Sequence, residues 1–301
     1  MPQKTEVLKN RMEQLARSLQ NNSDVLGLLG LGSVGGEIER LDDFSDLDFF
    51  LIVKEGKKAD FLKDTRWLSL DGARVTWIFQ NTPDGFKLFY EDGVYAENAV
   101  FTSDELKEAE YAPGRWWFRR EELDEALKNP SARVRDPSRN HADPNDADPH
   151  DATRSTADPE EGAEKRGGSP GVQVPSRDSS WLLGEILSCI YVGMCRFQRG
   201  EKLSAWRFIS GHAYSMFLEL LEMTASERGV EVSPEAAVRD PYSIERRIEL
   251  RQPEIEDCSS SILLGYDSIP ESAANFLDIL EDQFTVPRVP ADQIRGLSRL
   301  F

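Results

Sequence analysis

The sequence is poor in the residues that build metal clusters and disulfide frameworks. It has three cysteines and three histidines among 301 residues. Cys189, Cys195 and Cys258 form no CxxC pair and lie in or beside apolar segments. The spacing therefore predicts neither a zinc site nor a disulfide framework, and we expect three reduced core cysteines.

Long apolar runs and an excess of basic charge are missing too. No apolar run approaches the ~18 residues that span a bilayer, and the N-terminal segment lacks the apolar core of a secretory signal. The formal net charge is -18, which repels a phosphate backbone. We expect a cytoplasmic protein that binds neither membrane nor nucleic acid.

One segment lacks nearly all large apolar side chains. Residues 129–180 contain no Leu, Ile, Met, Phe, Tyr or Trp. Such a segment buries too little apolar surface to offset its ordering entropy, which predicts a disordered linker or insertion. It separates a first domain, residues 1–128, from a second, residues 181–301.

The first domain shows both helical and strand patterns. Leu8, Met12, Leu15 and Leu19 recur at helical spacing. Apolar runs predict strands, and the Asp92-Gly93 pair predicts a hairpin between the last two. The predicted strands are 25–31, 49–53, 74–80, 86–90 and 94–101. Together they indicate a mixed sheet of about four or five strands flanked by helices.

The second domain is almost wholly helical in its pattern. Two long apolar helices are predicted within 182–197 and 203–221, and weaker ones near 244–250, 273–280 and 292–300. These segments predict an all-α bundle. The chain as a whole is therefore expected to be α+β.

Two aspartates at the start of the second strand are candidates for metal chemistry. Asp46 and Asp48 have Asp-x-Asp spacing, which sets both carboxylates on one face of a strand. Two divalent ions held by carboxylates can neutralise a triphosphate during nucleotidyl transfer. Upstream, Gly32 and Ser33 follow a buried strand, where small residues let a phosphate approach the backbone.

A third carboxylate usually completes such a site, and two residues could supply it. Glu97 shares a strand face with Tyr95 and Ala99, where a buried charge needs a partner such as a metal. Asp92 lies in the predicted turn and is better suited to shape the hairpin. We therefore favour Glu97.

The run from Gly32-Ser33, through twelve residues, to Asp46-Leu47-Asp48-Phe49 resembles the signature of the polymerase-beta-like nucleotidyltransferase superfamily. The longer pattern LGSVGGEIERLDDFSDLDFFLIV, with the later FQRGEKLSAWRF, is similar to nucleotidyltransferases that modify lincosamides or aminoglycosides. The resemblance implies a minimal nucleotidyltransferase domain followed by a helical domain. It also implies that Asp46, Asp48 and Glu97 hold two Mg²⁺ ions, that Gly32-Ser33 binds phosphate, and that ATP or another nucleoside triphosphate is the substrate.

Two further features have alternative interpretations. Glu185, on an apolar helix of the second domain, could be the general base for the acceptor hydroxyl, or could form an ordinary salt bridge within its helix. The Trp116-Trp117 pair could stack a base or drug ring, or belong to a domain interface.

The leading hypothesis is a Mg²⁺-dependent transferase that moves AMP from ATP to a hydroxyl of a lincosamide-like or aminoglycoside-like small molecule. The alternatives are an antitoxin-type enzyme that adenylylates a protein and a degenerate module that only binds nucleotide. The expected partners are a nucleotide and a small-molecule acceptor, and a homodimer is left open.

Overall fold

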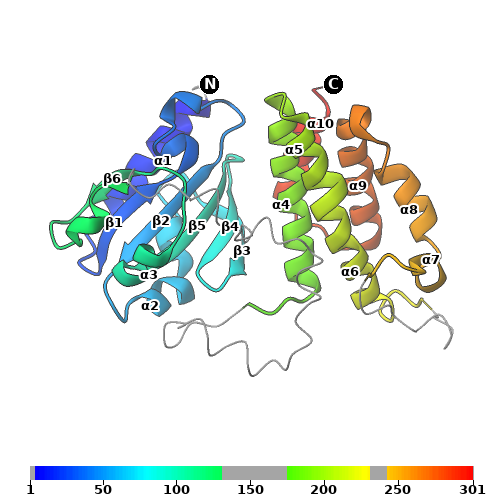
Figure 1. The fold of residues 1–301 in the computed structure, drawn as a ribbon, viewed down its shortest axis with the longest axis horizontal. Helices are drawn as coiled ribbons and strands as arrows, with labels where there is room; N and C mark the ends of the chain where they lie inside the picture. Colours follow the sequence, from blue (N-terminus) through cyan, green and yellow to red (C-terminus); the bar gives the residue numbers. More distant parts are fainter. Residues whose placement is uncertain (1–3, 131–174, 231–242, 301) are drawn as a thin grey trace. The chain divides into compact units, whose positions relative to one another are not determined.

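The computed structural model describes residues 4–130, 175–230 and 243–300. The chain divides into two compact units: the described residues up to Pro175 belong to an N-terminal unit, and those from Ser176 onward belong to a helical unit (Figure 1). Most of the predicted linker lies outside the described residues. Each unit is described by itself.

A mixed sheet with helices on both faces forms the N-terminal unit. The strand order is β3-β4-β5-β2-β1-β6. The pair β2 and β5 is parallel, and all other neighbouring strands are antiparallel. The elements are α1 (Lys4–Leu19), β1 (Val25–Gly30), η1 (Gly32–Val34), η2 (Ile38–Arg40), β2 (Leu47–Val53), α2 (Lys58–Lys63), η3 (Thr65–Leu68), β3 (Val75–Thr82), β4 (Gly85–Tyr90), β5 (Tyr95–Thr102), α3 (Ser103–Glu108), β6 (Arg115–Arg119) and η4 (Glu125–Leu127).

The central strands are apolar on both faces because each face enters a separate core. Alternate residues of a strand point to opposite faces, so neighbours along β1 and β2 pack in different clusters. The first core lies against α1 and the second against α3. The first contains Leu8, Met12, Leu15, Leu28, Phe49 and Leu51; the second contains Leu29, Ile52, Leu106 and Leu127.

The described part of the sheet has six strands, which corrects the expected four or five. The additional strand is β6 (Arg115–Arg119), an edge strand antiparallel to β1. Its five residues are charged at both ends and carry the Trp116-Trp117 pair, so the sequence pattern indicated only an aromatic cluster. The β4–β5 hairpin was predicted correctly, and Gly93 in its turn has a positive φ of 81°.

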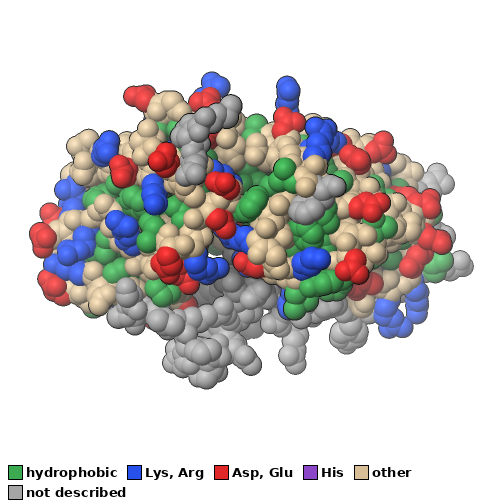
Figure 2. Space-filling model, turned by 90° about the horizontal axis from the view of Figure 1, so that it is seen from above, with side chains coloured by type: hydrophobic (Ala, Val, Ile, Leu, Met, Phe, Trp, Pro, Cys, Tyr) green, Lys and Arg blue, Asp and Glu red, His purple; other side chains and the backbone are tan. Residues whose placement is uncertain are grey.

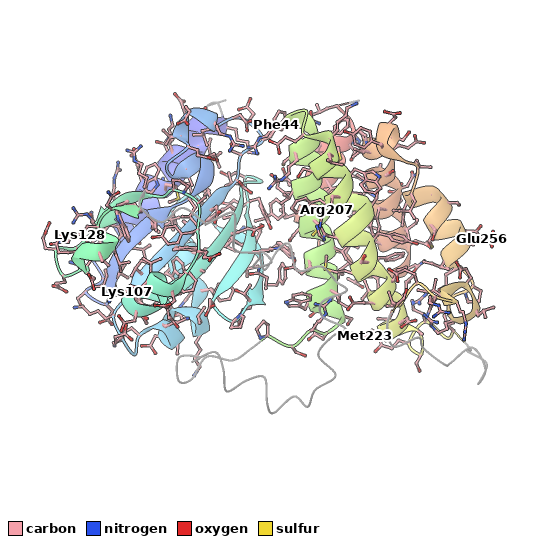
Figure 3. All side chains as sticks on the ribbon, in the orientation of Figure 1. Phe44, Lys107, Lys128, Arg207, Met223 and Glu256 are labelled. Atoms are coloured by element: carbon pink, nitrogen blue, oxygen red, sulfur yellow. The ribbon has the colours of Figure 1, made fainter. Side chains whose placement is uncertain are left out.

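The helical unit confirms the predicted all-α character of the second domain. The segment predicted as one helix over 203–221 is α5 (Lys202–Trp206), a π-helix η8 (Arg207–Ala213) and α6 (Tyr214–Thr224) in succession; Arg207, at the start of the π-helix, is labelled in Figure 3. All three cysteines are free and buried, as expected. The other elements are α4 (Ser179–Gln198), α7 (Ile248–Arg251), α8 (Ile255–Ile262), η9 (Tyr266–Ser268), α9 (Ile269–Gln283) and α10 (Arg288–Ser298).

The helix α4 corrects the expectation that no segment could span a bilayer. Among the described residues it is the one helix long and apolar enough to cross a membrane by length and composition alone. The core helix of a bundle meets the same two criteria. Within its unit α4 packs against α6, α9 and α10, and 61% of its apolar window is buried.

Candidate functional site

Asp46 and Asp48 lie at the start of β2, an interior strand of the sheet. Asp48 is the second residue of β2, and Asp46 comes just before the strand begins. Both are partly exposed, whereas Leu47 and Phe49 are fully buried. This alternation agrees with the two carboxylates sharing a face opposite the first core.

Glu97 lies directly across from Asp48. In the parallel pairing of β2 with β5, the Cα register joins Asp48 to Glu97. Residues paired in this way are about 4.8 Å apart across the strands and point to the same face. The backbone therefore sets Asp46, Asp48 and Glu97 on one face, at the amino-terminal ends of two adjacent strands.

The alternative third carboxylate, Asp92, has a different setting. It lies in the β4–β5 turn, outside β5, and accepts a hydrogen bond from Arg11 of α1 at 2.7 Å. It also accepts one from the backbone N–H of Val94 at 3.4 Å. These contacts make Asp92 a link between the hairpin and α1, so strand register favours Glu97 over Asp92.

Two residues contact Glu97: Tyr95, which was expected on the same strand face, and Lys87, which was not anticipated from the sequence. The hydroxyl of Tyr95 donates a hydrogen bond to Oε1 of Glu97 at 2.7 Å. The Nζ of Lys87, which lies opposite Glu97 in the β4–β5 register, is 4.0 Å from the same oxygen. Lys87 and Tyr95 are buried, and the Glu97 side chain is 26% exposed. A lysine in the middle of the apolar strand Phe86-Lys87-Leu88 is the signal that could have indicated an anionic partner.

The donor set matches a magnesium ion in its chemistry only. Magnesium binds carboxylate oxygens, and three of these residues share one face. Among the described residues, however, no group of three or more His, Cys, Asp or Glu side chains is close enough together to hold a metal ion. The strands set the three residues on one face, but their side chains do not meet as a metal-holding group, and Glu97 is oriented by Tyr95 and Lys87.

The Gly32-Ser33 turn lies beside the aspartates. The N–H of Leu31 donates to the carbonyl oxygen of Asp48 at 2.8 Å, which extends the β1–β2 pairing to the base of the turn. Gly32 has a positive φ of 49°, a conformation that glycine adopts at little cost. The predicted phosphate turn and the predicted metal ligands are therefore neighbours in the fold.

The edge strand β6 supports this turn. The indole N–H of Trp117 donates to the carbonyl oxygen of Val34 at 2.9 Å, and the N–H of Gly36 donates to that of Pro113 at 2.9 Å. At Gly35 a Cβ would lie 2.4 Å from the carbonyl oxygen of Gly30, so a larger residue would displace the turn. These contacts give Trp117 a supporting role within the N-terminal unit.

Trp116, which precedes Trp117 in the sequence, also makes its contacts within the N-terminal unit. Trp116 packs against the second core, and its indole N–H donates to the carbonyl oxygen of Leu127 at 3.2 Å. Each indole N–H thus anchors a loop of the N-terminal unit. The ring-stacking and domain-interface interpretations of the pair both stay predictions.

Glu185, the predicted base, lies on α4 of the helical unit. It is buried, with 8% of its surface exposed. Since the two units are described separately, its role as a base stays a prediction.

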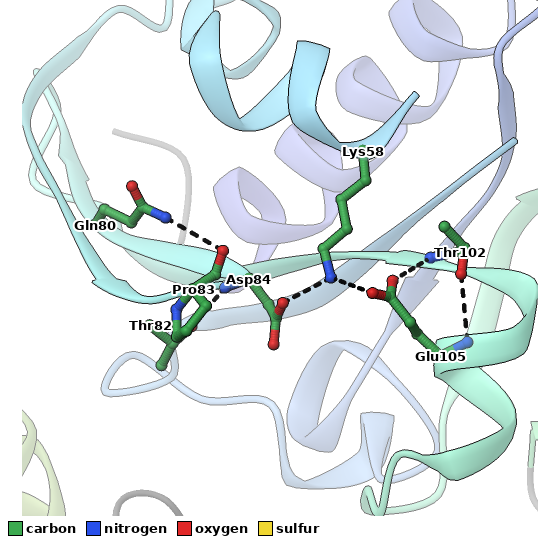
Figure 4. Close-up of polar contacts among 7 residues, drawn as sticks. All are labelled: Lys58, Gln80, Thr82, Pro83, Asp84, Thr102 and Glu105. Carbon is green, nitrogen blue, oxygen red and sulfur yellow. Dashed lines mark hydrogen bonds and ion pairs between the residues drawn. The ribbon is translucent and has the colours of Figure 1, made fainter. Parts of the chain in front are cut away.

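A second ionic cluster lies at the other end of β5 (Figure 4). The Nζ of Lys58 is 2.6 Å from a carboxylate oxygen of Asp84 and 2.6 Å from one of Glu105. Glu105 also forms a capping box with Thr102 at the start of α3. The Lys58 side chain is only 4% exposed. This cluster joins α2, the β3–β4 turn and α3.

Charges of both signs mix on the surface. On the face shown in Figure 2, Lys and Arg side chains are interspersed with Asp and Glu, without a continuous basic patch on that face. The expectation that nucleic acid is not the partner stays a prediction from the net charge of -18.

Comparison with known proteins found structural similarity only. No protein-family model matches the chain, and no curated protein was found to match it. The chain is similar to the crystal structure of an aminoglycoside 6-adenyltransferase from Bacillus subtilis, with 12% identity, coverage of 95% of this chain and 97% of that chain, and a TM-score of 0.31. It is also similar to a STING-associated CdnE c-di-GMP synthase from Capnocytophaga granulosa, with 13% identity, coverage of 98% and 78%, and a TM-score of 0.25.

Proposed function

We propose that this protein transfers a nucleoside monophosphate, AMP from ATP in the simplest case, to a hydroxyl group of a small molecule that resembles a lincosamide or an aminoglycoside. The observation that carries the proposal is the register of β2 with β5, which sets Asp48 opposite Glu97. The Gly32-Ser33 turn adjoins the same point through the Leu31–Asp48 hydrogen bond. Few enzymatic activities require acidic side chains and a phosphate-binding turn as neighbours in the fold.

The reaction exchanges one phosphorus–oxygen bond for another. The acceptor hydroxyl oxygen attacks the α-phosphorus of the triphosphate, and the bond from that phosphorus to the bridging oxygen of pyrophosphate breaks. The hydroxyl proton passes to a base, for which Glu185 is our candidate. Bound Mg²⁺, held by Asp46, Asp48 and Glu97, would neutralise the phosphate charges and fix the in-line geometry.

The helical unit supports a small acceptor over a protein one. A protein-adenylylating enzyme of the antitoxin type needs only the minimal domain, whereas this chain adds a bundle of helices to it. We propose that the bundle contributes to acceptor binding and that the protein acts in the cytoplasm.

Pyrophosphate release tests the proposal. The assay pairs ATP, GTP, CTP and UTP with a panel of lincosamides, aminoglycosides and hydroxylated metabolites in the presence of Mg²⁺. Asp48→Asn should abolish acceptor-dependent release, because it removes a ligand charge. Asp43→Asn, at an exposed aspartate of the preceding loop, is the matched control and should retain release.

Two other outcomes would overturn the proposal. Magnesium-dependent ATP binding without release for any pairing would indicate the nucleotide-binding module. Release that requires a protein acceptor would indicate the protein-adenylylating enzyme.

A further inference from the structure

The helical unit carries all of the large apolar side chains that are exposed in the described part of the chain. There are eight of them, and five lie on α5, on the turn that follows α8 and on η9. The helices α5 and η9 contact each other. These five side chains, each more than a third exposed, form what we call the apolar patch: Leu203, Trp206, Leu263, Leu264 and Tyr266. Exposed apolar side chains that gather in one region mark an interaction surface, whereas single ones are ordinary.

The exposed face of α5 is apolar in the middle and basic at both ends. Ala205 is buried, whereas the exposed residues of α5 and of the position after it are Lys202, Leu203, Trp206 and Arg207. Positions three or four apart lie on the same side of a helix, so these four residues form one face. Arg207, at which the π-helix begins, is labelled in Figure 3. Both charges on this face are positive.

The neighbouring element of the patch is acidic. Asp267 lies in η9 and Glu271 in the first turn of α9, and both are exposed. Lys202 lies 5.7 Å from the ring centre of Phe197, a contact that brings no negative charge to it. Within the described residues neither acidic side chain forms an ion pair, and neither do Lys202 and Arg207. The surface is therefore basic on α5, acidic on η9 and the start of α9, and apolar on both.

We propose that the apolar patch is the contact surface of a symmetric homodimer, in which α5 of one copy lies against η9 and the start of α9 of the other. In such a dimer a two-fold rotation brings the same surface of both copies together. A surface that is basic on one element and acidic on the next is complementary to its own rotated copy, because each basic element then meets an acidic one. A surface of one sign would repel its copy. This inference does not depend on the proposed function.

The net charge of the chain makes this local complementarity necessary. Two copies that each carry a charge of -18 repel each other. Association therefore requires burial of apolar side chains together with opposite charges at the contact. Four unpaired charges of both signs around one apolar patch supply these two conditions in the same place.

Charge reversal tests the proposed geometry. The variants Lys202→Glu/Arg207→Glu and Asp267→Lys/Glu271→Lys each place like charges opposite one another, so the dissociation constant of each homodimer should rise at least about tenfold. Mixed in equal amounts, the two variants should form a heterodimer, because both contacts again join opposite charges. A chain with all four changes should dimerise like the wild type, which would also exclude misfolding as the cause of the losses.

A matched pair of apolar substitutions tests the patch itself. Leu203 is 68% exposed on α5, and Leu250 is 62% exposed on α7. Leu203→Glu should raise the dissociation constant at least about tenfold, because it buries a charge without a partner in the contact. Leu250→Glu adds the same charge outside the contact and should leave association unchanged.

Sedimentation equilibrium of the full-length protein without nucleotide measures these outcomes. The wild type should approach twice the chain mass of 34.0 kDa as its concentration rises. A wild type that stays monomeric at every attainable concentration would overturn the proposal, and so would a mass that grows beyond the dimer. Dimerisation of Leu203→Glu as tight as that of the wild type would show that the copies meet through another surface. If the two charge-reversed variants fail to associate with each other, the two-fold arrangement is wrong.

Discussion

Replacing Lys58 by methionine should destabilise the N-terminal unit selectively. The change keeps most of the apolar stem but leaves Asp84 and Glu105 without the ammonium that lies 2.6 Å from each (Figure 4). Removing one partner of a fully buried ion pair costs about 3–5 kcal/mol. Asp84 is 37% exposed and Glu105 is 23% exposed. Hydration of the two carboxylates therefore offsets part of this cost. We expect a loss of about 2–3 kcal/mol in the free energy of unfolding, which corresponds to a midpoint lowered by roughly 6–12 °C for a unit of this size.

Hydrogen exchange resolved by mass spectrometry can assign this loss to one unit. Peptides from residues 4–130 should lose protection in Lys58→Met, and peptides from residues 176–230 should keep it. The double variant Lys58→Met/Glu105→Gln is the informative control. It removes the more buried of the two uncompensated charges while leaving an oxygen to accept the N–H of Thr102, a bond of 2.8 Å in the native protein. The free energy of unfolding of this double variant should exceed that of Lys58→Met by at least about 1 kcal/mol. A single variant as stable as the wild type, or a double variant no better than the single, would refute the reasoning.

Three further predictions concern the turn, the helical unit and the ligand. Trp117→Phe removes the bond to the carbonyl oxygen of Val34, so the KM for the nucleotide should rise by about fivefold, the equivalent of about 1 kcal/mol, while the far-ultraviolet circular dichroism spectrum stays unchanged. Asp178→Ala removes the amino-terminal cap of α4 and should lower the stability of the helical unit by about 1 kcal/mol in urea unfolding at neutral pH. Hydrogen bonds from Ser180 and from the Trp181 N–H lower the pKa of Asp178 below 3.8; the stability that this shift contributes is therefore present above pH 3.8 and lost as the pH falls through the lowered pKa. Mg²⁺ with ATP should raise the thermal midpoint of the protein, and EDTA should reverse the rise; a midpoint indifferent to both would contradict nucleotide binding.

The sequence predicted the helices and strands with continuous or regular apolar patterns. The run over 25–31 reads as a buried strand because both faces of β1 (Val25–Gly30) enter a core. The strand order was not predictable, because a local pattern does not indicate which strand is the neighbour. For the same reason the parallel pairing of β2 with β5 appears only in the structure. The π-helix Arg207–Ala213 was missed because its apolar residues fit an ordinary helical period closely enough.

The shared strand face of Asp46 and Asp48 was predictable from alternation, and the surroundings of Glu97 were predictable only in part. The alternation along β5 indicated that Glu97 lies on a largely apolar face and needs a partner. The structure supplies Tyr95 and Lys87 as partners. Tyr95 reaches Glu97 along the same strand, but the contact with Lys87 depends on the register of β4 with β5, and register is set by tertiary packing. The metal-binding and phosphate-binding roles of the acidic residues and of the turn stay predictions.

The parallel pairing of β2 with β5 also bears on the order in which the protein folds. All of β3 and β4 lies between these strands in the sequence. Asp48 and Glu97 therefore become paired in the sheet only after the long chain segment between them has formed a closed loop. Pairings between residues far apart in sequence are slow to form. A partly folded chain with only α1, β1 and β2 in place would carry the Gly32-Ser33 turn and the two aspartates without the third carboxylate. During synthesis, the complete acidic face can therefore arise only once β5 has left the ribosome.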